Sequence, residues 1–178
     1  MRIIAGSLGG RLIKAPPSGP TKPMSEKLRG ALFSALGDIS KMSILDAFSG
    51  SGAIALESYS RGAKSVVAVD SSAVAVSIIK ANAVSLNVYG AELKVVNADI
   101  GRWADYCESK FDLIIADPPY NKPQPDAVSK LSRLLNPNGH LVLSWPPKTQ
   151  LPNLTNLELL KTKKYGDASL TYFCLVRR

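Results

Sequence analysis

The sequence is poor in the residues that bind metals and form disulfides. Two cysteines and one histidine occur among its 178 residues. Cys107 and Cys174 have no CxxC spacing and no histidine beside them, so neither a structural zinc site nor a disulfide framework is expected. Because His140 is the single histidine, histidine-rich metal centres are excluded, and no motif supports a Ser/His/Asp triad. We therefore predict no metal site and a reduced, cytoplasmic setting.

The sequence also lacks a long apolar stretch. The longest run, Ala73 to Ile79, is interrupted by Ser77 and ended by Lys80. That run is too short to span a bilayer, and no apolar segment follows the opening charge. We therefore expect neither a signal peptide nor a membrane partner.

Acidic residues are scarce relative to basic ones. The chain has 22 Lys and Arg against 14 Asp and Glu, which gives a net charge of +8. Hydrophobic residues make up 46% of the sequence, enough for a substantial core in one domain of this length. The excess of positive charge on so small a domain favours a polyanionic partner.

Residues 1–23 differ in pattern from the rest of the chain. Residues 2–6 and 11–14 are short strand-like runs, and the glycine-containing segment 7–10 between them predicts a β-hairpin. The proline-rich stretch 16–23 is expected to be irregular and extended. We call residues 1–23 the basic arm and expect them to belong to the same domain as the remainder.

Residues 24–178 alternate between helical and strand-like patterns. A helix capped by Ser25 and ended by Gly37 comes first. The pattern then predicts strands at Ser43–Phe48, Lys64–Asp70, Glu92–Asn97, Phe111–Asp117 and Gly139–Trp145. It predicts helices at Ala53–Arg61, Ser72–Leu86, Gly101–Cys107 and Gln124–Leu135. The inner face of the second of these is expected to carry Val74, Ile78, Ala81 and Val84. Leu157–Tyr165 and Ser169–Val176 predict a closing hairpin.

This alternation predicts an α/β fold with helices on both faces of a mostly parallel sheet. The closing hairpin makes the last strand antiparallel, and the basic arm adds an N-terminal β-hairpin.

The most informative motif is Asp117-Pro118-Pro119-Tyr120, which directly follows the apolar strand Phe111–Ala116. Two prolines end both helix and ladder at this point, because they lack an N–H donor and fix φ. The stiff turn presents one carboxylate, free carbonyls and an aromatic face. These groups suit a planar ring with an exocyclic amine, whose two hydrogens Asp117 and a proline carbonyl can accept while Tyr120 stacks. The motif resembles that of class I methyltransferases acting on base amines or glutamine amides.

A glycine loop ends the first strand of the alternating region. Gly50 and Gly52 let the backbone approach a ligand, and the helix that follows favours a negative group at its start. Asp70 closes the next strand, where a carboxylate suits ribose hydroxyls. After the third strand, Asp99 can accept from an adenine amine while Ile100 packs on the ring.

The same loop also fits the dinucleotide pattern G-x-G-x-x-G/A, which alone leaves a nicotinamide cofactor open. Two features favour a methyltransferase instead. Asp46 lies at the strand end, four residues before Gly50, as in methyltransferase cofactor loops, and the Asp117–Tyr120 motif has no role in hydride transfer. No Walker lysine is present, which disfavours a nucleoside triphosphatase.

Together these segments resemble the RsmD family, bacterial methyltransferases of small-subunit ribosomal RNA. The resemblance covers nearly the whole chain, and its most specific parts are the opening Arg2–Gly6 and the closing Lys164–Asp167. The chain departs from the family pattern at Lys22-Pro23-Met24, where Arg-Pro-Thr is usual, and at Gly30.

The resemblance implies methyl transfer from S-adenosylmethionine to a guanine N2 in 16S ribosomal RNA, by a cytoplasmic monomer acting on an assembled or assembling small subunit. The implied catalytic residues are Asp117, Pro118, Pro119 and Tyr120. Cofactor contacts are expected from Asp46, Phe48, Gly50, Ser51, Gly52, Asp70, Ser71, Asp99, Ile100 and Asp117. RNA contacts are expected from Arg2, Arg11, Lys14, Lys22, Lys27 and Arg29.

Other exocyclic-amine enzymes remain open as alternatives: DNA adenine-N6, DNA cytosine-N4 or protein glutamine methyltransferases. A non-catalytic RNA-binding assembly factor is disfavoured, because both the cofactor motif and the amine motif are complete.

Overall fold

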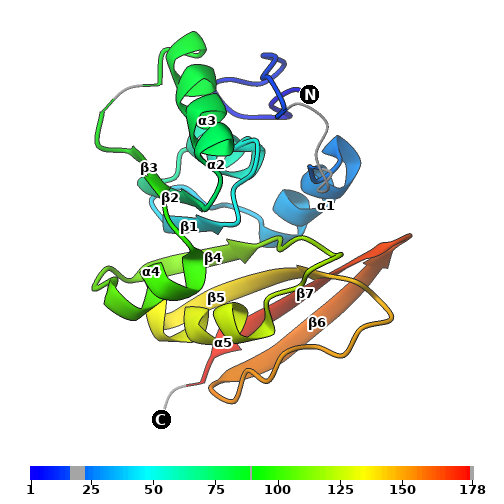
Figure 1. Cartoon of the computed structure of the whole chain (residues 1–178). Helices are drawn as coiled ribbons and strands as arrows, with labels where there is room; N and C mark the ends of the chain where they lie inside the picture. Colours follow the sequence, from blue (N-terminus) through cyan, green and yellow to red (C-terminus); the bar gives the residue numbers. More distant parts are fainter. Residues whose placement is uncertain (17–22, 89, 177–178) are drawn as a thin grey trace.

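A seven-stranded sheet organises the computed structural model, which describes residues 1–16, 23–88 and 90–176 (Figure 1). Its strands are β1 (Ser43–Ala47), β2 (Ser65–Asp70), β3 (Leu93–Asn97), β4 (Phe111–Ala116), β5 (Leu135–Trp145), β6 (Leu157–Tyr165) and β7 (Ala168–Leu175). Their order across the sheet is β3-β2-β1-β4-β5-β7-β6. The first five pair in parallel, whereas β7 is antiparallel to both β5 and β6. The predicted fold class is confirmed.

Helices cover both faces of the sheet. They are α1 (Glu26–Leu36), α2 (Ala53–Ser60), α3 (Ala73–Ser85), α4 (Ile100–Tyr106) and α5 (Pro125–Leu131). Alternation along β5 shows how the core is divided, since Leu141 and Leu143 pack with α4 and α5 while Val142 packs in the cluster of α1 and α2. Ser25 caps α1 by accepting from the Leu28 N–H at 3.2 Å, and Gly37 ends it with φ 75°, both as predicted.

Most predicted boundaries agree with the structure to within a residue, but two differ by several residues. The helix expected to reach Leu135 stops at Leu131 and is followed by a 3-10 turn, Ser132–Leu134. Strand β5 begins at Leu135 instead of Gly139, because Leu135 already pairs with Phe111 before an irregularity in the register. Pairing with β4 therefore overrides the turn signal of Asn136–Gly139.

The predicted inner face of α3 is wrong by one position. Val74 and Val84 are more than half exposed, at 58% and 59%. The buried positions include Ile79 and Asn82. Asn82 is buried because its amide donates to the Lys14 carbonyl at 2.9 Å and its oxygen accepts from the Lys14 N–H at 2.9 Å. A polar residue thus occupies a core-facing position that an apolar pattern does not reveal.

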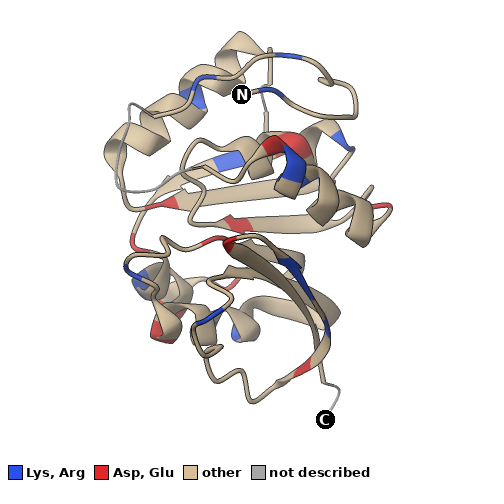
Figure 2. Cartoon of the chain, turned by 90° about the vertical axis from the view of Figure 1, so that its right-hand side faces the viewer, with Lys and Arg blue, Asp and Glu red and all other residues tan. Residues whose placement is uncertain are grey.

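Residues 1–16, the described part of the basic arm apart from Pro23, lie beside α2 and α3 (Figures 1 and 2). Its hairpin has a single bridge, Arg2 to Leu12, in place of two full strands. Ile3 and Ile13 are buried in a cluster with Leu56 of α2 and residues of α3. The described part of the arm is therefore packed into the body of the protein.

Glu57 of α2 anchors the arm. Its buried carboxylate accepts from the N–H groups of Ile4 at 2.7 Å and Ala5 at 3.0 Å. It also pairs with the Nε atoms of Arg61 at 2.8 Å and Arg29 at 3.6 Å. Both carboxylate oxygens are satisfied, which is the condition for burying such a charge.

Among residues 1–16, 23–88 and 90–176, no helix is long and apolar enough to cross a membrane. In the same residues, no group of three or more His, Cys, Asp or Glu side chains is arranged to hold a metal ion.

Candidate active site

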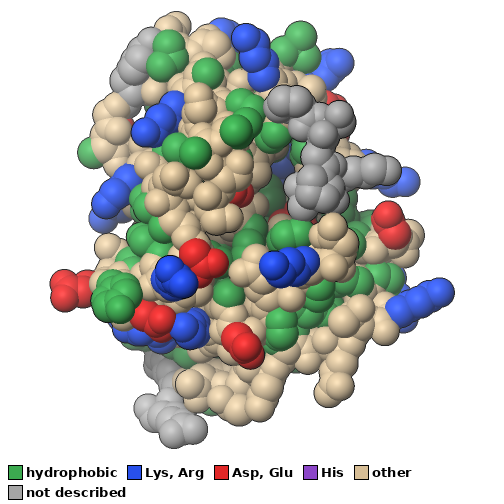
Figure 3. Space-filling model, in the orientation of Figure 1, with side chains coloured by type: hydrophobic (Ala, Val, Ile, Leu, Met, Phe, Trp, Pro, Cys, Tyr) green, Lys and Arg blue, Asp and Glu red, His purple; other side chains and the backbone are tan. Residues whose placement is uncertain are grey.

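A cavity of about 660 Å³ opens at the carboxyl ends of the parallel strands. It lies where the strand order reverses between β1 and β4, the usual ligand position in open α/β sheets. The loops after β1, β2, β3 and β4 all contribute to its wall. In Figure 3, acidic side chains are visible at the bottom of the hollow between the upper and lower parts of that face. The volume is in the range of small-molecule sites.

The glycine loop after β1 has an unusual backbone. Phe48 has a positive φ of 70°, which is costly for an aromatic residue, and Gly50 and Gly52 have φ of 52° and 75°. A Cβ on Gly52 would lie 2.8 Å from Cγ1 of Ile79, so this glycine allows the loop to pack directly on α3. A Cβ on Gly50 would meet nothing within 4 Å. Phe48, Gly50 and Ser51 line the cavity, whereas Gly52 lies behind its wall.

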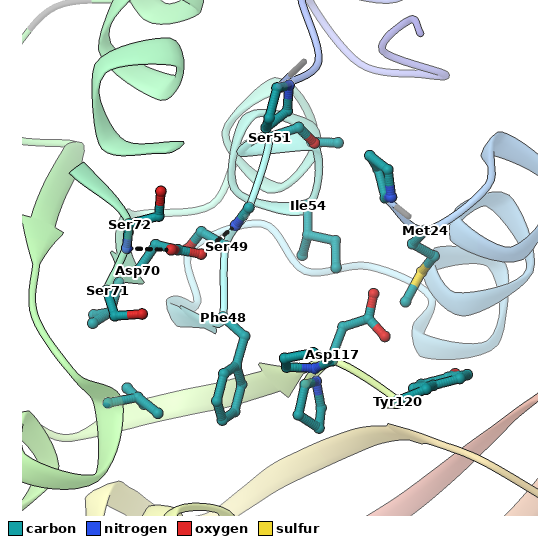
Figure 4. A pocket seen from close by; sticks show the side chains of 18 of the residues that line it. Met24, Phe48, Ser49, Ser51, Ile54, Asp70, Ser71, Ser72, Asp117 and Tyr120 are labelled. Carbon is teal, nitrogen blue, oxygen red and sulfur yellow. Dashed lines mark hydrogen bonds between the residues drawn. The ribbon is translucent and has the colours of Figure 1, made fainter. Parts of the chain in front are cut away.

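Asp70 holds this loop to the end of β2. Its Oδ2 accepts from the Gly50 N–H at 2.7 Å and its Oδ1 accepts from the Ser72 N–H at 2.8 Å. Figure 4 shows the carboxylate between the two loops. Asp70 and Ser71 both line the cavity. Each carboxylate oxygen can accept more than one hydrogen bond, so the group can still receive a ligand hydroxyl.

Asp46 does not line the cavity, although the sequence predicts a direct cofactor contact. It is fully buried beneath the loop, with Oδ2 accepting from the Ala55 N–H at 3.0 Å and Oδ1 without a partner. Burial raises the pKa of Asp46 to about 8, and the neighbouring Asp117 and Asp70 add to the rise. In this structure Asp46 supports the start of α2 from behind the cavity wall.

The Asp117–Tyr120 turn forms the wall opposite the glycine loop, and all four of its residues line the cavity. In Figure 4 the Asp117 carboxylate points into the cavity and the Tyr120 ring lies at its side. The oxygens of Tyr120 and Ser144 lie 2.7 Å apart. Burial raises the pKa of Asp117 to about 6, and a hydrogen bond from Ser144 opposes the rise. Burial also raises the pKa of Tyr120 to about 12, so its hydroxyl stays protonated at neutral pH.

Asp99 and Ile100 complete the predicted cofactor set, and both line the cavity. Asp99 caps α4 by accepting from the Arg102 N–H at 2.9 Å, and Ile100 is buried at the start of that helix. The structure therefore gathers every predicted cofactor and catalytic position at one cavity except Asp46 and Gly52.

Several lining residues were not predicted. Met24, Ser25 and Leu28 come from the start of α1, and Asp167 and Ala168 come from the turn between β6 and β7. Figure 4 places Met24 close to Tyr120. The family resemblance singles out Lys22-Pro23-Met24 and Lys164–Asp167, which contain Met24 and Asp167, but nothing in either segment assigns it to the cavity.

The predicted RNA contacts divide into three groups. Arg2, Arg11, Lys14 and Lys27 are exposed, as a phosphate contact requires. Lys22 lies outside the described residues. For Arg29 the prediction is wrong, because its side chain is 0% exposed and is held by Glu57 and the Met24 carbonyl.

Comparison with known proteins agrees with this geometry. The chain is 31% identical over 143 residues to ribosomal RNA small subunit methyltransferase D of Escherichia coli K12, covering 79% of this chain and 69% of that protein. It is 28% identical over 175 residues to the protein of the same name in Haemophilus influenzae, covering 95% and 91%. YlbH of Bacillus subtilis is 30% identical, with 93% and 94% covered.

Solved structures are similar as well. A protein of Thermus thermophilus superimposes with a TM-score of 0.83 at 28% identity, covering 97% of this chain and 98% of that one. Magnesium protoporphyrin IX methyltransferase of Synechocystis, solved with bound SAM, shares the fold with a TM-score of 0.65 at 18% identity, covering 85% and 77%. The family model described as "Conserved hypothetical protein 95" matches residues 1–174. The chain therefore belongs to this family, the RsmD-family methyltransferases.

Proposed function

We propose that this protein transfers a methyl group from S-adenosylmethionine to the exocyclic N2 amine of a guanine in 16S ribosomal RNA. The observation that carries the proposal is the shared cavity. The glycine loop and Asp70 form one side of it, and Asp117 and Tyr120 form the other. Relatives named ribosomal RNA small subunit methyltransferase D support the choice of ribosomal RNA.

As an RsmD-family methyltransferase, the protein uses S-adenosylmethionine. The cavity fits this cofactor by the chemistry of its donors and acceptors. Asp70 offers a carboxylate to ribose hydroxyls and Asp99 offers one to an adenine amine. At the start of α2, Asp46 accepts from the Ala55 N–H, while the N-cap residue Gly52 has no side chain to compete for the other N–H groups. The side chains of Phe48 and Ile100 supply apolar contacts for the adenine ring.

The bound cofactor supplies a methyl group already activated on a positive sulfonium. The remaining difficulty is the guanine N2, whose lone pair is delocalised into the ring. Asp117 and the Pro118 carbonyl accept the two amine hydrogens, which localises the lone pair and orients it. Tyr120 holds the ring by stacking, an interaction worth roughly 1–3 kcal/mol per base. The proton leaves after the nitrogen becomes cationic, so positioning accounts for much of the rate.

Ser144 connects the two functional groups of the catalytic turn. Its hydroxyl oxygen lies 2.7 Å from that of Tyr120, a contact in which either group can donate, and it lowers the pKa of Asp117. Ser144 is 1% exposed, so water does not compete for the bond to Tyr120. That bond holds the aromatic ring in place beside the carboxylate.

A stacked guanine does not present its amine in line with a methyl donor. We therefore propose a loop nucleotide or a flipped base as the target, in a small subunit that is assembled or assembling. The exposed basic residues of the arm and Lys27 hold the phosphates beside it. We propose that the enzyme acts as a monomer in the cytoplasm, where ribosomal RNA is found.

The test is methyl transfer from labelled S-adenosylmethionine to small subunits, free ribosomal RNA and DNA from cells lacking the enzyme. Nucleoside mass spectrometry should then find N2-methylguanosine in 16S RNA. Asp117→Ala should abolish transfer and leave cofactor affinity nearly intact, whereas the exposed Asp126→Ala serves as the control. Label found in DNA or on a protein glutamine instead would refute RNA as the substrate. An equal loss of cofactor affinity in Asp117→Ala would refute the role given to Asp117.

A further inference from the structure

Strand β6 forms one edge of the sheet and is unusually exposed. Its residues 158–164 are all exposed, and they include three lysines, Lys161, Lys163 and Lys164. Figure 2 shows the blue segments following one another along this strand, with a red one nearer its other end. One acidic residue, Glu158, belongs to the strand.

The pairing register shows which lysines share a face. Lys161 pairs with Tyr172 and Lys163 with Leu170, and directly paired residues point to the same side of a sheet. Leu170 and Tyr172 belong to the core cluster beneath α1. Lys161 and Lys163 therefore lie on the α1 side of β6. Lys164, next along the strand, points to the opposite side.

Contacts to α1 support this assignment. The Lys161 Nζ atom lies 3.4 Å from the Ala35 carbonyl oxygen and 4.6 Å from the centre of the Tyr172 ring. These contacts direct the side chain along the surface toward α1.

The strand leads to the mouth of the cavity. Tyr165 at its end pairs with Ala168, and both Asp167 and Ala168 line the cavity. The cavity wall also includes the start of α1, where Lys27 is exposed. Exposed lysines of both α1 and β6 therefore belong to elements whose ends line the cavity that holds the catalytic turn.

These lysines are not neutralised within the protein. The ion pairs among the described residues involve none of the three β6 lysines. By contrast, Lys130 of α5 and Arg133 of the 3-10 turn both form ion pairs with Asp105 of α4. Figure 3 shows charges of both signs next to one another over α4 and α5. A basic row without acidic partners is the pattern of a phosphate-binding surface.

We propose that the α1-facing side of β6, with Lys161 and Lys163, is a second RNA-binding surface, in addition to the arm, that holds backbone phosphates flanking the target nucleotide. The inference rests on the proposed function. Residues two apart on a strand lie roughly 6–7 Å from one another. That spacing is comparable to the separation of neighbouring phosphates in an extended strand, so each lysine can contact one phosphate.

The test compares RNA affinity for Lys163→Glu with two matched charge reversals. Lys164→Glu changes the next residue of the same strand on the opposite face, and Lys94→Glu changes an exposed lysine on β3, the other edge of the sheet. All three alter net charge equally. Lys163→Glu should weaken RNA binding several-fold more than either control, while cofactor affinity and kcat at saturating RNA stay unchanged.

The salt dependence gives a second measurement. If each lysine contacts one phosphate, Lys161→Ala with Lys163→Ala should reduce the log–log salt slope by about 1.4, at roughly 0.7 per single-stranded phosphate. Lys163→Arg should retain wild-type affinity. Equal losses of RNA affinity in Lys163→Glu, Lys164→Glu and Lys94→Glu would overturn the inference. The proposed function would still stand in that case, provided that the wild-type enzyme methylates RNA. Wild-type enzyme that neither binds nor methylates RNA would refute both.

Discussion

The pKa of Asp117 predicts how activity depends on pH. The proposed mechanism needs an ionised carboxylate to accept an amine hydrogen, and burial raises the pKa of Asp117 to about 6. With that pKa, roughly a tenth of the Asp117 side chains are ionised at pH 5 and roughly nine tenths at pH 7. Therefore kcat/KM for RNA should rise about tenfold from pH 5 to its plateau. An ordinary aspartate would lose almost nothing at pH 5.

The variant Ser144→Ala sharpens this prediction. The Ser144 hydrogen bond lowers the pKa of Asp117, so its removal should move the midpoint of the profile to higher pH. Activity on the plateau should also fall, because Tyr120 loses its partner at 2.7 Å.

The assay is initial-rate methyl transfer to RNA between pH 5 and pH 8, with cofactor affinity and unfolding measured at each pH as controls. A wild-type profile that is flat from pH 5 to pH 7, with cofactor binding and folding unchanged, would refute the reasoning. If the pH profile of Ser144→Ala has the same midpoint as that of the wild type, Ser144 does not lower the pKa of Asp117.

Three further predictions concern stability, measured by urea unfolding. Glu57→Ala should cost about 3–5 kcal/mol, because it leaves a buried guanidinium without its partner, whereas exposed Glu108→Ala should cost little. Gly52→Ala should cost roughly 1–3 kcal/mol, since its Cβ would meet Ile79 at 2.8 Å with φ at 75°. Because the pKa of Asp46 is raised to about 8 in the folded state, the unfolded chain releases a proton that the folded chain keeps. The free energy of unfolding should therefore fall as pH rises from about 4 to about 8, and Asp46→Asn should flatten that dependence; an unchanged slope would show that Asp46 is ionised when folded.

Local patterns were sufficient for much of the architecture. The strand end at Asp70 and the one just before Asp117 could be located from short apolar runs followed by turn residues, and the cap at Ser25 from its position before a helical stripe. These features depend on neighbours within a few residues, so the sequence alone predicts them. Because parallel strands end at the same edge of a sheet, the motifs that follow them meet in one site.

What the sequence by itself determined, then, was the α/β alternation and the pairing of a glycine loop with an amine-binding turn. The tertiary structure alone decided that Arg29 is buried, since its compensating carboxylate on Glu57 belongs to a different helix. It also decided that Asn82 faces inward to hold the arm, and that Met24 and Asp167 close the cavity. Each of these outcomes depends on contacts between segments distant along the chain, whose energies no local pattern contains.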